Sequence, residues 1–156
     1  MAVEKHEVID LAENQLRSAI GLFVSEQDLF SAITLAGAAD TLLCRLVSNQ
    51  GEENFTQHVL ESENDPNKTI AEMGREINDM FFINALKHMD ANDDGIVVMD
   101  VKEAAIGAIL KALPNYITLR GNNVDFVQAF LAWVKLNLDP AIYNIDCDPK
   151  WEPTKA

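Results

Sequence analysis

Hydrophobic residues recur at steps of three and four along most of this chain, which is the spacing of one face of an α-helix. The stretches that carry this periodicity are residues 5–24, 29–47, 69–89, 101–113 and 123–138. The β-branched run at 96–98 is too short to build a sheet. The sequence therefore predicts an all-α fold, a bundle of four to five helices.

The first two helices are expected to pack against each other. Asp28 is placed to cap the helix over 29–47, and only a short polar break separates this helix from the one before it. Such a short connection favours antiparallel neighbours, so residues 5–47 are predicted to form a helical hairpin that opens the bundle. The polar, acidic stretch at 48–68 is expected to be a surface connection with one short helical turn around 55–60.

Later helix ends are also marked in the sequence. Thr69 and Glu72 form a capping-box pattern, which predicts that the third helix begins there. Asp100 is expected to cap the fourth helix and Pro114 to end it, because proline inside a helix removes a backbone hydrogen bond.

The chain is long enough for one domain with a sizeable core. It has 156 residues, of which 48% are hydrophobic and 24% charged, a composition typical of globular proteins. We therefore expect a single helical-bundle domain over residues 1–145. The polar, proline-containing stretch at 146–156 is expected to be an irregular C-terminal tail.

The charge balance is strongly acidic and limits the partners that the chain can attract. Twelve Lys and Arg residues against 25 Asp and Glu residues give a formal net charge of −13. A field of that sign repels nucleic-acid phosphates and anionic lipids, so we expect neither nucleic-acid nor membrane binding. The charged start of the chain lacks the apolar stretch of a secretory signal, and no window approaches the roughly 18 apolar residues of a membrane span. These features predict a cytoplasmic protein.

Common catalytic motifs are missing from the sequence. The glycines form neither a GxGxxG nor a GxxxxGKS/T phosphate loop, and there is no GxSxG or HExxH motif. Three histidines and two well-separated cysteines leave few members for a nucleophile–histidine site or a zinc cluster. We therefore expect no cofactor, and a non-catalytic role is favoured over enzymatic chemistry.

Polar residues interrupt the apolar face of the predicted helix over 69–89. Asn84 and His88 continue the stripe that begins with Ile77, by steps of three and four. Asp40 occupies the inward side of the second helix. If these three side chains meet, they form either a buried polar network that sets helix register or a ligand-binding or catalytic site. A third alternative places them on the surface.

One polar segment resembles the first half of an EF-hand calcium loop. Asp90, Asn92 and Asp94 place oxygen atoms at alternating positions, and Gly95 follows where such loops turn sharply. The twelfth position, where a glutamate normally supplies two oxygen ligands, is Val101. The segment is therefore interpreted either as a polar turn or as a weak divalent-cation site.

Two motifs carry a resemblance to known families. The first two helices contain AxxxLxxAIxLFxxxxDxxxAxTLAGAAD over residues 12–40, and NxxKHxD follows at 84–90. Together these motifs resemble a family of uncharacterised bacterial all-helical proteins, over residues 12–95 of this chain. A more distant resemblance is to the HEPN superfamily and its abortive-infection relatives. Those proteins are helical bundles, often dimers, and several are metal-independent ribonucleases of defence systems.

The HEPN resemblance implies an arginine followed by a polar residue and then, a few positions later, a histidine. The matching positions in this chain are Ile83, Asn84 and His88, so the arginine is missing. Without this cation, phosphate transfer loses a main electrostatic stabilisation of its transition state. The resemblance therefore implies a binding or interaction protein rather than a nuclease.

The favoured interpretation is a non-catalytic bacterial protein that acts through protein–protein contact and self-associates as a homodimer. The small residues of the second helix and the flank of the helix over 123–138 are the expected dimer surfaces. Two alternatives stay open. One is a HEPN-like RNA-directed or defence-associated module with a site around Asn84 and His88, and the other is a weak divalent-cation binder at residues 90–101.

Overall fold

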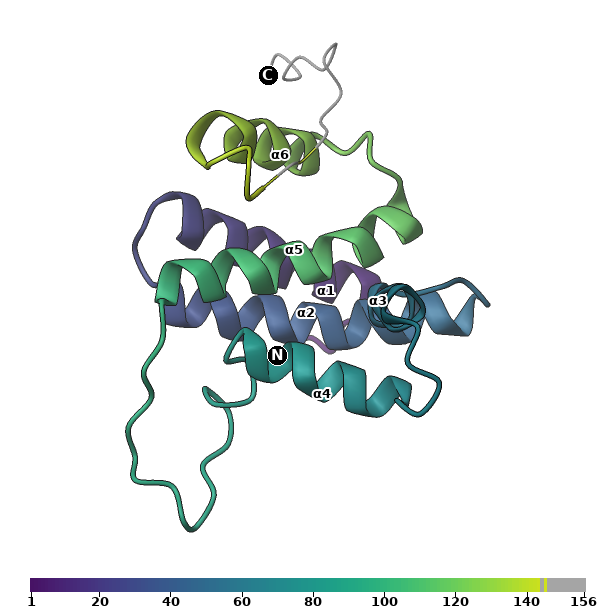
Figure 1. The fold of residues 1–156 in the computed structure, drawn as a ribbon. Helices are drawn as coiled ribbons and strands as arrows, with labels where there is room; N and C mark the ends of the chain where they lie inside the picture. Colours follow the sequence, from purple (N-terminus) through teal and green to yellow (C-terminus); the bar gives the residue numbers. More distant parts are fainter. Residues whose placement is uncertain (144, 146–156) are drawn as a thin grey trace. The chain divides into compact units, whose positions relative to one another are not determined.

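The computed structural model describes residues 1–143 and 145, and within them all regular secondary structure is helical (Figure 1). Six helices occur in this part, so the all-α prediction is confirmed while the expected number of four to five is too low. They are α1 (Val8–Val24), α2 (Leu29–Asn49), α3 (Phe55–Glu63), α4 (Ile70–Met80), α5 (Val101–Arg120) and α6 (Asp125–Asn137).

The chain divides into two compact units, Met1–Leu119 and Arg120–Ala156. The first contains α1 to α4 and nearly all of α5, and the second contains α6. The single domain over residues 1–145 stays a prediction of the sequence, and the boundary between the two compact units lies after Leu119. The predicted tail at 146–156 lies outside the described residues.

α1 and α2 pack against each other and are joined by the short connection at 25–28 (Figure 1). Small side chains allow the two helices to approach closely, because Ala32, Ala36 and Ala39 of α2 are fully buried. This Ala-rich face is therefore used inside the monomer. Its burial excludes it as the dimer surface that its composition suggested.

The predicted helix caps are present in the first unit. The Asp28 carboxylate accepts a hydrogen bond from the backbone N–H of Ser31 at 3.0 Å. Thr69 and Glu72 form the reciprocal capping box at the start of α4. The hydrogen bond from the Thr69 backbone, with that from its hydroxyl, lowers the pKa of the Glu72 carboxyl. These local signals confirm three helix starts, since Asp100 likewise accepts from the first turn of α5.

The connection after α2 is more ordered than the sequence predicts. Residues 55–63 form the full helix α3 rather than a single turn. Asn54 caps this helix, and Gln57 Oε1 accepts a hydrogen bond from the Asn54 backbone N–H at 2.9 Å. Asn54 is only 4% exposed, so this polar connection reaches the interior of the first unit.

α4 ends at Met80, nine residues before the end that periodicity predicts. Phe82 has a left-handed backbone with φ of 58°, which turns the chain out of the helix. This turn lets two side chains fill notches left by glycines on other helices. Ile83 lies against Gly37 of α2, and the ring of Phe81 lies against Gly107 of α5. Packing of these side chains therefore overrides the helical period.

α5 continues through Pro114 to Arg120, so the predicted end of this helix at the proline is wrong. The residues after Pro114 are held in place by tertiary contacts. The Asn115 side chain is bonded to Asp40 at 2.9 Å, and the Tyr116 hydroxyl donates to Glu13 at 2.7 Å. These contacts offset the helical hydrogen bond that proline removes.

The second unit contains α6, and its bounds agree closely with the predicted helix over 123–138. The buried side of α6 presents a continuous apolar row, formed by Val127, Phe130, Leu131 and Val134. The rings of Phe130 and Trp133 are stacked, with centroids 6.4 Å apart. Leu136 is 84% exposed, so part of the predicted contact flank of this helix is apolar and accessible.

By length and composition, α2 could cross a membrane, with a mean hydropathy of 1.4 over its most apolar window. This finding corrects the expectation that no window approaches such a span. The core helix of a soluble protein passes the same test of length and composition. Eight residues of α2 are buried in the fold, and the charged Asp40 is one of them.

The glycine notch on α2 leads to a stability prediction. Gly37→Ala should lower the free energy of unfolding by about 1–3 kcal/mol, because the new Cβ overpacks against buried Ile83. An ideal Cβ at this position would lie 2.5 Å from Ile83 Cγ2. Gly21→Ala on α1 is the matched control, since its Cβ would meet no atom within 4 Å and alanine favours the helix. Urea denaturation of both variants measures the difference, and equal stability of the two would contradict the notch.

Candidate functional site

A buried ion pair connects α2 and α5 in the first unit. Asp40 of α2 and Lys111 of α5 are each only 4% exposed, and Lys111 Nζ donates a hydrogen bond to Asp40 Oδ2. Asn115, one turn further along α5, donates from Nδ2 to Asp40 Oδ1 at 2.9 Å. Both oxygen atoms of the carboxylate are therefore satisfied, as a buried charge requires.

The same cluster also positions α3. Asn115 Oδ1 accepts a hydrogen bond from the backbone N–H of Phe55, the first residue of α3, at 2.9 Å. That N–H is one of the donors at a helix start that have no partner inside the helix. The Asp40 carboxylate is thus connected through one amide to a third helix, so α2, α3 and α5 meet at this point.

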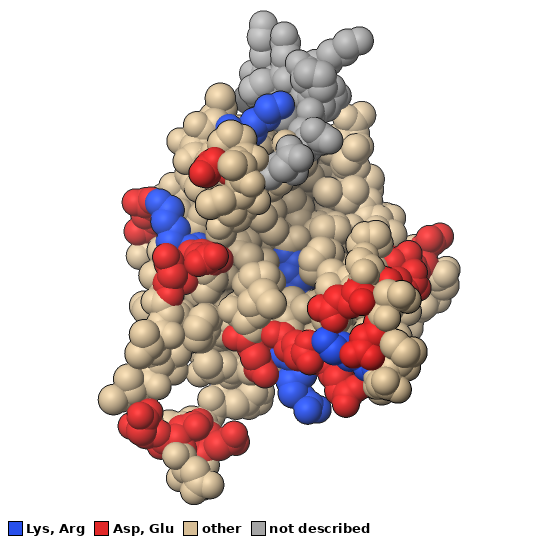
Figure 2. Space-filling model, viewed as in Figure 1, with Lys and Arg blue, Asp and Glu red and all other residues tan. Residues whose placement is uncertain are grey.

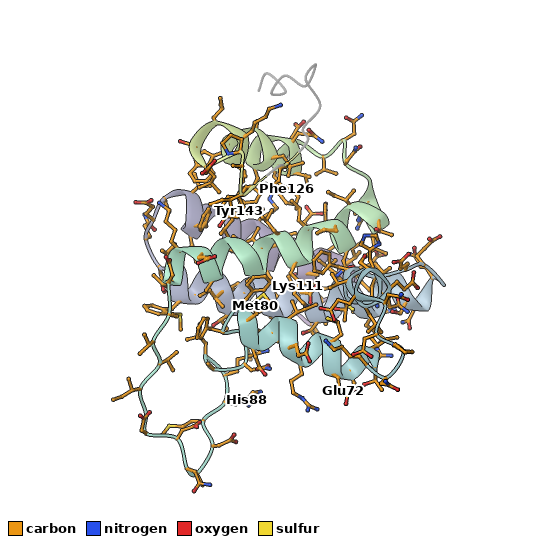
Figure 3. All side chains as sticks on the ribbon, in the orientation of Figure 1. Glu72, Met80, His88, Lys111, Phe126 and Tyr143 are labelled. Carbon is orange, nitrogen blue, oxygen red and sulfur yellow. The ribbon has the colours of Figure 1, made fainter. Side chains whose placement is uncertain are left out.

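The structure does not bring together the three residues of the predicted polar site. Asp40 is buried, but its partners are Lys111 and Asn115. Asn84 donates to the Asp79 carboxylate at 2.8 Å, and His88 is exposed. The reason is the early end of α4, because the helical stripe that would carry Asn84 and His88 inward stops at Met80. Figure 3 shows His88 well away from Lys111.

Sequence reasoning missed Lys111 and Asn115, although a signal for them existed. Lys111 is the one charged residue in the otherwise apolar run at 104–113. Asn115 follows at a spacing of four, which places both on the same side of a helix. The expectation that Pro114 ends the helix hid this relation, since it left Asn115 outside the helix.

A pocket of about 320 Å3 opens above the ion pair. Its walls come from α2, from the start of α3 and from α4, and the buried Lys111 of α5 also lines it. Figure 3 places Lys111 between α5 and α4, and at that position in Figure 2 blue atoms lie at the bottom of a hollow. The lining residues that matter for its chemistry are Asp40, Thr41, Cys44, Arg45, Asn78 and Lys111.

Cys44 contributes a thiol to the lining of this pocket. Burial raises the pKa of the Cys44 thiol, and the nearby Asp40 carboxylate raises this pKa further. Lys111 and Arg45 act in the opposite direction but do not reverse the shift. The thiol therefore stays protonated at neutral pH and is a weak nucleophile. This environment suits binding better than covalent chemistry.

Residues 84–100, which we call the arm, form a long loop that extends away from the helices of the first unit (Figure 1). Among the described residues, no group of three or more His, Cys, Asp or Glu side chains is placed to hold a metal ion. Asp94 instead accepts from the backbone N–H of Ile96 at 3.0 Å, and Asp93 accepts from that of Asp90 at 2.7 Å. The weak divalent-cation site at Asp90, Asn92 and Asp94 therefore stays a prediction.

Comparison with protein-family models, curated proteins and solved structures gives no match to this chain. The resemblances to a bacterial helical family and to the HEPN superfamily therefore stay predictions. The position that corresponds to the HEPN arginine is Ile83, which is 1% exposed and packs against Gly37. This position is part of the apolar packing of the first unit.

The ion pair makes a quantitative prediction. Lys111→Met should lower the free energy of unfolding by about 3–5 kcal/mol, because it leaves a buried carboxylate without a cation. The double variant with Asp40→Asn removes the charge as well and should recover most of that loss in urea denaturation. Lys102→Met, which breaks an exposed salt bridge with Glu26, should have little effect. If the loss of stability in the double variant equals the sum of the losses in Lys111→Met and Asp40→Asn, the two side chains are not coupled.

The arm makes a prediction about cations. Calcium should raise the melting temperature no more than magnesium does at the same concentration, because both ions only screen the repulsion among the arm aspartates. Differential scanning fluorimetry with each chloride salt measures this. A saturable, calcium-selective increase that Asp90→Ala removes would establish a specific site instead.

Proposed function

We propose that this protein is a cytoplasmic bacterial protein without catalysis of its own, which acts through protein–protein contact and self-associates as a homodimer. The antiparallel α1–α2 hairpin serves as the rigid framework in this proposal, and the arm serves as the contact surface. The observation that carries the proposal is the exposure of apolar side chains along the arm.

Exposed apolar residues occur in both halves of the arm. Met89 is 70% exposed, Ile96 is 72% exposed and Val98 is 86% exposed. Adjacent exposed apolar side chains of this size are a common mark of an interaction surface. Burying them in a contact removes apolar area from water, which is the main favourable term in association.

A second copy of this chain fits the run at 96–99. Its four residues, Ile-Val-Val-Met, are uncharged, and within the described residues the backbone N–H groups of Val97 and Val98 have no hydrogen-bond partner. Two such runs can pair with each other across a two-fold axis, because each supplies the donors and acceptors that the other needs. A two-fold contact of this kind forms a closed dimer.

The charges of the arm oppose this pairing and give it a characteristic salt dependence. The arm carries one lysine and four aspartates, and Figure 2 shows the acidic side chains gathered on it. Two arms brought together therefore repel each other through exposed charges. Moderate salt screens this repulsion, so the dimer should become tighter as salt is added.

Light scattering tests the proposal directly. At about 100 µM, well above a micromolar dissociation constant, the wild-type chain should have twice its monomer mass of 17.3 kDa. The double variant Ile96→Ser, Val98→Ser should be monomeric and fold normally, because both side chains are exposed in the monomer. Leu136→Ser is the matched control, since Leu136 is equally exposed but lies on α6.

Two results would reject this function. One is a monomer mass for the wild-type chain under these conditions. The other is a dimer that persists in the arm variant but is lost in Leu136→Ser, which would assign the contact to α6 instead.

A further inference from the structure

The base of the pocket beside α2 holds a cation that the protein itself does not fully satisfy. The Lys111 ammonium group has three N–H donors, and its partner in the described residues is the Asp40 carboxylate alone. Lys111 is 4% exposed and lines the pocket. Buried donors without acceptors are costly, so this ammonium group requires further acceptors from whatever occupies the pocket.

The wall of the pocket adds donors of the same kind. Arg45 also lines it, and no ion pair to Arg45 is present among the described residues. The Asn78 side chain lines the opposite wall, on α4, and its amide is without a hydrogen bond in the described part of the chain. Three groups that can donate hydrogen bonds thus converge from three helices.

The charge of the pocket has the opposite sign to that of the protein. Arg45 and Lys111 supply two positive charges, and Asp40 is the one acid among the lining residues. Both Asp40 oxygen atoms are already engaged, by Lys111 and Asn115, so the carboxylate does not compete for the free donors. The pocket therefore carries one net positive charge within a chain of formal net charge −13.

From these observations we infer that the pocket binds a small polar molecule through an oxyanion group, either a carboxylate or a phosphate. Lys111 contacts the oxyanion at the base, and Arg45 and Asn78 contact it from the two walls. The Thr41 hydroxyl donates to the Gly37 carbonyl at 3.0 Å, so its lone pairs remain as acceptors for a hydroxyl or amine of the ligand. A volume of about 320 Å3 suits a small metabolite.

The first experiment compares inorganic phosphate and acetate with sodium chloride at equal ionic strength. A ligand that binds only the folded protein raises its melting temperature in a saturable manner. We expect this increase from at least one of the two oxyanions, and the one that acts at the lower concentration identifies the preferred group. Sodium chloride separates specific binding from general screening of charge.

Substitutions of residues in the pocket wall test whether the oxyanion binds there, and they leave the Asp40–Lys111 ion pair intact. Arg45→Gln should weaken oxyanion binding by roughly tenfold, because it removes a charged donor. Asn78→Ala should weaken it by a smaller factor. Arg75→Gln is the matched control, since Arg75 is exposed on α4 and does not line the pocket. Lys111→Met is not used for this purpose, because its effect on folding would mask any loss of binding.

A second measurement uses Cys44 as a reporter. Cys44 lines the pocket, so a bound oxyanion should slow the alkylation of its thiol by iodoacetamide in wild type and less so in Arg45→Gln. Two outcomes overturn the inference. In one, neither oxyanion stabilises the protein more than chloride does, and in the other, Arg45→Gln and Arg75→Gln lose affinity equally.

Discussion

The arrangement of the first unit depends on the neutralisation of one buried carboxylate. Asp40 lies on the central helix α2, and an isolated charge at that depth would carry a large desolvation cost. Lys111 and Asn115 satisfy both of its oxygen atoms, which fixes the position of α5 along α2. Because Asn115 also accepts from the Phe55 backbone, the start of α3 is set by the same interaction. An apolar contact between these helices would tolerate small shifts in register, whereas this hydrogen-bonded cluster does not.

A second constraint on the path of the chain comes from two glycines, which have no side chain and so leave space for a neighbour. Gly37 and Gly107 leave notches on α2 and α5, and Ile83 and Phe81 occupy them. Both occupants follow directly after α4, so the chain must leave the helix at Phe82 in order to place them. The arm follows from residue 84 and extends away from the helices, which leaves its apolar residues in solvent. The early end of α4 therefore creates the proposed contact surface.

The two accessible features of the first unit differ in chemistry. The arm is apolar and acidic, and the pocket is polar with one net positive charge. The pocket is built on three helices that the Asp40 cluster holds in register, which provides rigid walls for a ligand. The arm has neither helix nor strand along its length, and local turns such as the one that Asp93 closes onto the Asp90 backbone shape it instead.

Local signals in the sequence determined the helical class, most helix starts and the inward position of Asp40. Caps such as Asp28 and Thr69 act through hydrogen bonds to residues two or three positions away, so they can be recognised in a single sequence. The end of α4 and the continuation of α5 through Pro114 depended on residues distant in the chain. Ile83 packs against Gly37, and the Asn115 side chain is hydrogen-bonded to Asp40. The partners of Asp40 were likewise decided by tertiary structure, because a buried charge pairs with whichever cation the packing of helices brings to it, and periodicity along one helix contains no information about the next.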